Sequence, residues 1–178
     1  MKRRSPITKN EHAMAMVAQA VKNQIPFEYV LADTWYASVE NMRILRKKLK
    51  KHFVMPLKDN RNVALSKEDH KRGCYVKVEN LVIEDHATIQ IWLEDLPFPL
   101  LLVKQVFTNE DGSTGVLYLV TSNLDLTYDE ITAIYQKRWN VEPFHKSIKQ
   151  NASLAKSPAH TVTTQTNHFF AAVWLRQT

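Results

Sequence analysis

Four polar side chains in the last third of the sequence have types and a spacing that suit phosphate chemistry. They are Tyr135, Arg138, Glu142 and Lys149. On an uninterrupted helix, with about 100° between residues, they would share a strip about 60° wide. One carboxylate would then lie among two cations and a phenol, a suitable surround for a metal ion and phosphate groups. Pro143 favours a helix start at Glu142, and ordinary charge pairing at a surface helix end is the alternative interpretation.

The same spacing resembles the signature of bacterial insertion-sequence DDE transposases. In this sequence it consists of Tyr135, two residues, Arg138, three residues, Glu142, six residues and Lys149. The neighbouring segments 134–142 and 144–146 are also similar to that family. Upstream, the segment 29–38 (YVLADTWYAS) resembles the family's strand that carries the second catalytic aspartate. The resemblance extends over residues 25–172, which is most of the chain.

The resemblance implies a fold, a reaction and a set of site residues. The fold would be α/β and RNase H-like, with a β-strand insertion between the second aspartate and the glutamate. Asp33 and Glu142 would be catalytic metal ligands, and Tyr135, Arg138 and Lys149 would hold phosphates of the transposon end. The reaction would be DNA cutting and joining by two-metal phosphoryl transfer. Hard oxygen ligands suit Mg²⁺, with Mn²⁺ as a substitute.

The charges of the chain are segregated along the sequence. The formal net charge is +6. Residues 43–72 carry 11 basic and 3 acidic residues, whereas residues 79–133 carry 1 basic and 10 acidic residues. Within it, residues 43–51 resemble a helix face that follows DNA phosphates, and Lys47, Lys48 and Lys51 are the predicted contacts. A solvated charged surface is the alternative.

Hydrophobic periodicity predicts the elements that would position these residues. Apolar stripes predict helices over residues 11–23 and 37–51, and apolar runs predict strands over 27–33 and 52–58. Segments around 75–78, 87–93, 100–108 and 114–121 are typical of consecutive antiparallel strands. A capping box at Thr127 and Glu130 opens a helix to about residue 139, and another helix is predicted over 141–151. We therefore divide the chain into a partial core (1–72), a β-rich insertion (73–126) and C-terminal helices (127–178).

Composition excludes several other classes of protein. The single cysteine, Cys74, rules out a disulfide framework and a cysteine-based zinc site. Three glycines are too few for a glycine-rich phosphate loop. The longest apolar run, residues 96–103, is too short to cross a membrane, and residues 1–12 lack the apolar core of a signal peptide. These features predict an intracellular protein, and the resemblance implies a cytoplasmic one that associates with the bacterial nucleoid.

One part of the family pattern has no counterpart in the sequence. A DDE site needs three carboxylates, but residues 1–10 precede the first predicted helix and contain no acid. We therefore expect a catalytic-domain fragment, incomplete at its N-terminus, inactive alone and marginally stable. Its partner would be double-stranded DNA, both transposon ends and target, and the complete enzyme would be a dimer in a synaptic complex. The alternatives are a non-catalytic DNA-binding remnant and an RNase H-like nuclease unrelated to transposition.

Overall fold

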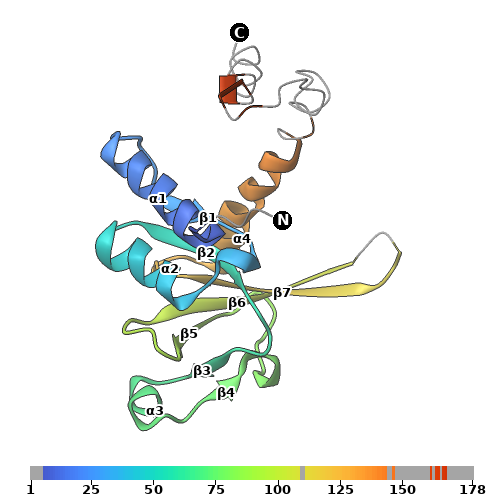
Figure 1. Cartoon of the computed structure of the whole chain (residues 1–178). Helices are drawn as coiled ribbons and strands as arrows, with labels where there is room; N and C mark the ends of the chain where they lie inside the picture. The colour runs from blue at the N-terminus through green and yellow to red at the C-terminus, as the bar shows by residue number, and fades with distance from the viewer. Residues whose placement is uncertain are drawn as a thin grey trace. The chain divides into compact units, whose positions relative to one another are not determined.

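Seven strands form one mixed sheet in the order β1-β2-β7-β6-β5-β3-β4 (Figure 1). The computed structural model describes residues 6–108, 111–143, 146, 161, 163, 164, 166 and 167. Strands β1 and β2 are parallel, and the other strand pairs of the described residues are antiparallel. The strands are β1 (Tyr29–Leu31), β2 (His52–Leu57), β3 (Asn62–Ala64), β4 (Val76–Lys77), β5 (Thr88–Leu93), β6 (Leu100–Thr108) and β7 (Thr114–Thr121).

Helices precede, connect and follow these strands. The chain divides into two compact units, Met1–Tyr135 and Gln136–Thr178, and the sheet lies in the first. The helical elements are α1 (Lys9–Lys22), the 3-10 turn η1 (Thr34–Tyr36), α2 (Val39–Arg43), the π-helical η2 (Ile44–Lys48), α3 (Lys67–Arg72), the 3-10 turn η3 (Val78–Asn80), α4 (Tyr128–Gln136) and the 3-10 turn η4 (Lys137–Asn140).

The sheet of the first unit has an apolar cluster on each face. Alternate residues of β2 point to opposite faces, so Phe53 and Met55 join one cluster and Val54 joins the other. The first cluster also contains Met42 of α2, whereas the second contains Ile131 of α4. A sheet covered on both faces explains why β2 and the first half of β6 are apolar without alternation.

Most predicted elements are confirmed, with ends that differ by a few residues. The predicted helix 37–51 is shorter than expected, because α2 passes into η2 and helical structure ends at Lys48. The capping box is present: the Thr127 backbone N–H donates to Glu130 at 2.8 Å, and the Glu130 N–H donates back to the Thr127 hydroxyl at 3.4 Å. Residues 141–143 and Lys146 of the predicted helix 141–151 are described as helical, and the rest of that range lies outside the described residues.

The β-rich segment shares the sheet of the N-terminal strands. Strand β7 pairs with β2, and β5 pairs with β3, so strands from residues 73–126 continue the sheet that β1 and β2 begin. The mixed α/β class is confirmed, and this sheet is consistent with an RNase H-like fold. The division into a partial core, an insertion and C-terminal helices stays a prediction.

Candidate functional site

Asp33 lies at the carboxyl end of β1, two residues beyond Leu31. Its side chain is exposed, and its Oδ1 atom accepts a hydrogen bond from the Trp35 backbone N–H at 2.9 Å. This bond makes Asp33 the N-cap of η1, so the local backbone fixes the direction of the carboxylate. In the sequence, a run of mostly apolar residues that ends in an acid predicted that Asp33 lies at the end of a strand. The structure confirms this position, because β1 ends two residues before Asp33.

A polar pocket of about 410 Å³ begins at the next residue, Thr34. Its lining includes Lys58, Asp59, Glu79 and Tyr118. Asp59 follows the last residue of β2 by two positions, as Asp33 follows that of β1, and β1 and β2 are parallel. Burial raises the pKa of the Tyr118 phenol, and the nearby carboxylates of Asp59 and Glu79 raise it further. Sequence reasoning missed this pocket, although polar residues after parallel strands were a usable signal.

Arg138 and Glu142 form an ion pair in the second unit. The Arg138 Nη1 atom lies 3.7 Å from Glu142 Oε1, and the guanidinium lies over the Trp139 ring at 4.7 Å from its centroid. The Glu142 side chain is 58% exposed, so water or a ligand can reach its carboxylate. Tyr135 lies in α4, Arg138 lies in the turn η4, and Glu142 follows that turn. Lys149 lies outside the described residues.

Tyr135 is a core residue of the first unit. Its side chain is 3% exposed and joins the apolar cluster that contains Val54, Leu119 and Ile131. Sequence reasoning assigned Tyr135 to a phosphate-binding strip and missed this packing role. The spacing of four between Ile131 and Tyr135 was the available signal, because such residues share one helix face. A phosphate contact of Tyr135 stays a proposal.

The three predicted DNA-binding lysines have different surroundings. Lys47 and Lys48 are exposed on η2, and the Lys47 ammonium lies 5.5 Å from the centre of the Phe98 ring. The Lys51 ammonium instead donates to the Phe27 backbone carbonyl at 2.7 Å and lies 4.6 Å from the centre of the Phe27 ring. Lys51 therefore links the residues after η2 to the segment before β1. Of the three lysines, Lys47 and Lys48 are the exposed ones.

The described residues contain no ready-made metal centre. Among them, no three or more His, Cys, Asp or Glu side chains gather closely enough to hold a metal ion.

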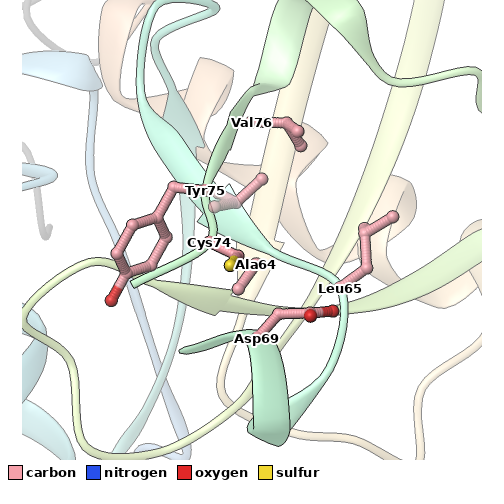
Figure 2. Close-up of a pocket in the computed structure, with 7 residues that line it drawn as sticks. Ala64, Leu65, Asp69, Cys74, Tyr75 and Val76 are labelled. Atoms are coloured by element: carbon pink, nitrogen blue, oxygen red, sulfur yellow. The ribbon is translucent and has the colours of Figure 1, made fainter. Parts of the chain in front are cut away.

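A separate pocket of about 210 Å³ lies beside β3, α3 and β4, and the exposed Cys74 is one of its lining residues (Figure 2). Figure 2 shows the Tyr75 phenol turned away from Asp69 there, and its hydroxyl lies 3.1 Å from Nδ1 of His70. Within the described part of the chain, no helix has the length and apolar character needed to span a membrane.

The comparison with known families matches most of the chain. The sequence profile of the family described as "Transposase DDE domain" matches residues 6–176. This range includes both candidate carboxylates and the whole described sheet. No curated protein is significantly similar to the chain.

Proposed function

The chain belongs to the family of transposase DDE domains, and on this premise we propose that Asp33 and Glu142 ligate the divalent metal with which it acts on DNA. The family's activity is DNA transposition, so its substrate is DNA. The placement of Asp33 carries the proposal. Its carboxylate is exposed at the end of a parallel strand, and one oxygen is anchored by the Trp35 N–H. The other oxygen makes no hydrogen bond or ion pair with a described residue and is available to a ligand.

The donor chemistry of these residues fits Mg²⁺, with Mn²⁺ as a substitute. Both side chains offer carboxylate oxygens, and both are exposed. When bound, two such ions stabilise the charge on the entering and leaving oxygens of a phosphodiester under in-line attack. Arg138 already lies beside Glu142, and its planar guanidinium would hold a phosphate oxygen there. Tyr135 and Lys149 would add phosphate contacts by the same resemblance.

The spacing of Tyr135, Arg138, Glu142 and Lys149 supports a narrower assignment within the family. It matches the signature of bacterial insertion-sequence transposases, which cut a transposon end and join it to target DNA. The substrate would then be double-stranded DNA, and the complete enzyme would act as a dimer that pairs two transposon ends. Such a protein would work at the bacterial nucleoid.

Exposed cations on η2 support a direct contact with duplex DNA. Each lysine that neutralises a phosphate adds about 0.9 to the slope of log affinity against log salt concentration. We expect Lys47→Gln combined with Lys48→Gln to reduce that slope by about 1.8. Lys51→Gln should change the slope less and should lower the melting temperature, because it removes the donor to the Phe27 carbonyl. Fluorescence anisotropy with a duplex oligonucleotide at several salt concentrations measures the slope.

A matched control is available on α3. Lys67 and Lys71 are exposed and lie at two positions of one short helix, so Lys67→Gln with Lys71→Gln removes the same charge elsewhere. The slope of this control should stay close to that of the unchanged protein. Equal reductions in both double variants would show a diffuse charge effect and would count against a DNA contact at η2.

We propose that the 178 residues do not cleave DNA by themselves. Asp33 and Glu142 supply two carboxylates, whereas the resemblance requires three. Incubation of the purified chain with supercoiled plasmid and Mg²⁺ should produce no more nicked circles than the Glu142→Ala variant does. Mg²⁺-dependent nicking that Glu142→Ala abolishes would contradict this proposal and would show that the chain completes its own site.

A non-catalytic DNA-binding protein is the second candidate function. The ion pair that already engages Glu142 favours it. This candidate keeps the DNA contacts of η2 but gives Asp33 no metal to bind. The two candidates therefore agree on the salt dependence of DNA binding and disagree on the effect of Asp33→Ala on metal affinity.

A further inference from the structure

A second polar pocket lies at the opposite end of β1 and β2 from Asp33. Tyr29 and His52 are paired at the start of these parallel strands, and Ser122 directly follows the end of β7. Asp33 follows Tyr29 by four residues, which is about 13 Å along an extended chain. The pocket has a volume of about 390 Å³, and its lining includes Arg46, His52, Phe98, Ser122, Asn123 and Asp125.

Hydrogen bonds hold the polar wall of this pocket in place. His52 Nδ1 and the Ser122 hydroxyl lie 3.2 Å apart, and the Ser122 residue is only 6% exposed. The Asn123 amide donates to the Tyr29 hydroxyl at 2.6 Å, while its carbonyl oxygen accepts from the Asp125 backbone N–H at 3.2 Å. These bonds connect the starts of β1 and β2 to the turn after β7, so the wall is built before any ligand arrives.

The cation of the pocket has no partner among the described residues. Arg46 is partly buried on the π-helical η2, yet its guanidinium makes no hydrogen bond or salt bridge with a described side chain or carbonyl. Arg43, one turn earlier, is bonded to both Glu40 and the Asp95 carbonyl. A partly buried guanidinium loses water without gaining an acceptor, and an anion in the pocket would supply one.

The balance of charge in the pocket also favours an anion. Burial lowers the pKa of the His52 imidazole below its usual value, and the Arg46 guanidinium lowers it further. The carboxylates of Glu28 and Asp125 oppose this effect more weakly. The lowered pKa favours the neutral form of His52 near pH 7, so Arg46 is the cation of the pocket wall and Asp125 is its carboxylate. Lys47 adds a second cation near the rim, over the Phe98 ring, while the carboxylate of Asp125 is exposed to solvent.

We propose that this pocket binds a backbone phosphate of duplex DNA, with the Arg46 guanidinium and the Ser122 hydroxyl as donors and His52 beside them. The proposal rests on the proposed function, which makes DNA the substrate. Arg46 shares η2 with Lys47 and Lys48, so the pocket would continue their phosphate contacts into the protein. Because the pocket and Asp33 lie at opposite ends of β1, this phosphate is not the one beside the metal site proposed at Asp33.

The pKa of His52 reports directly on an anion in this pocket. A neighbouring phosphate favours the imidazolium form, so the pKa should rise by about one unit when a duplex oligonucleotide binds. We would measure it by NMR titration of the imidazole in the free chain and with three ligands: the duplex, the same duplex with uncharged methylphosphonate linkages, and inorganic phosphate. We expect the rise with the duplex and none with the methylphosphonate duplex.

Two variants separate this site from general charge effects. Arg46→Gln should abolish the rise in the His52 pKa and weaken duplex binding roughly tenfold. Arg72→Gln removes the same charge from the exposed end of α3 and should leave both properties unchanged. The methylphosphonate comparison uses the unchanged protein, so it holds even if Arg46→Gln folds poorly.

The outcomes distinguish this inference from the proposed function. A bound duplex that leaves the His52 pKa unchanged would overturn the pocket assignment while DNA binding through η2 stands. A rise with inorganic phosphate but not with duplex would overturn the assignment to the DNA backbone. Failure of the chain to bind duplex at all would overturn the proposed function, and with it the inference that rests on it.

Discussion

Replacement of Asp33 by alanine is expected to weaken Mn²⁺ binding by the DNA-bound chain by a factor of roughly ten or more. Loss of a residue that only supports a metal ligand costs about 10–100-fold in affinity, so loss of a ligand itself should cost at least as much. Mn²⁺ substitutes for Mg²⁺ at oxygen sites, and its free form gives a resolved electron paramagnetic resonance signal. Titration of the chain and of the variant with Mn²⁺, followed by this signal, measures the change.

Asp111 provides the matched control for this experiment. Like Asp33 it is exposed, and its Oδ1 accepts a hydrogen bond from a backbone N–H two residues later, that of Ser113, at 2.9 Å. Asp111→Ala should leave the Mn²⁺ affinity unchanged, whereas Glu142→Ala should reduce it as Asp33→Ala does. Equal affinity in all of these variants would contradict the metal site and favour the non-catalytic DNA-binding protein.

Phe53→Ala is expected to cost about 3–5 kcal/mol of the free energy of unfolding. Phe53 is fully buried in β2, where it joins Met42 and Leu45 in the larger core cluster. Domains are typically stable by about 5–15 kcal/mol, so this loss is a large fraction of the total free energy of unfolding. Urea titration followed by circular dichroism measures the loss.

Phe107 is the control for burial. It is 44% exposed on the β6–β7 hairpin, which extends beyond the rest of the sheet in Figure 1, and its ring lies over Gly115. Phe107→Ala should cost about 1 kcal/mol or less, because much of the removed surface already contacts water. Equal losses of the free energy of unfolding in the two variants would contradict the burial of Phe53 in the core cluster.

Long apolar elements could be predicted from the sequence because their patterns are strong. The apolar stripe of α1 and the Val- and Leu-rich runs of β6 and β7 are long enough that no single residue decides the prediction. Two short elements, β3 and α3, were not predicted in this way. Strand β3 has three residues and α3 has six, with no apolar stripe in α3. Ser66 as N-cap and Gly73 in the left-handed conformation mark the ends of α3, and these cap residues were the available signal.

Strand pairing and side-chain direction lay beyond the sequence patterns. The pairing of β2 with β7 joins residues about sixty positions apart, and periodicity within a segment does not identify such a partner. Lys51 was predicted on a cationic helix face, but η2 ends at Lys48 and Lys50 has a φ of +56°. This left-handed residue turns the chain, so the Lys51 ammonium reaches the Phe27 carbonyl.

Asp33 shows what the sequence could establish about the site. An apolar run ending in an acid placed it at a strand end, and the structure confirms that place. The sequence pattern could not show the hydrogen bond from the Trp35 N–H, because capping depends on the turn that the following residues adopt. It also could not show that Tyr135 packs into the core, since one helical residue can face the apolar cluster and still fit a signature spacing.

We propose that Asp33 and Glu142 ligate the same metal site, and metal-directed cleavage of the chain shows whether both lie beside a bound metal. Fe²⁺ bound in place of Mg²⁺, with ascorbate and peroxide, cuts the backbone next to its ligands, and mass spectrometry of the fragments maps the cuts. We expect two clusters of cuts, near residues 33 and 142, both lost in Asp33→Ala and retained in Asp111→Ala. Cuts near residue 142 that persist in Asp33→Ala, or no localised cuts in the unchanged chain, would contradict it.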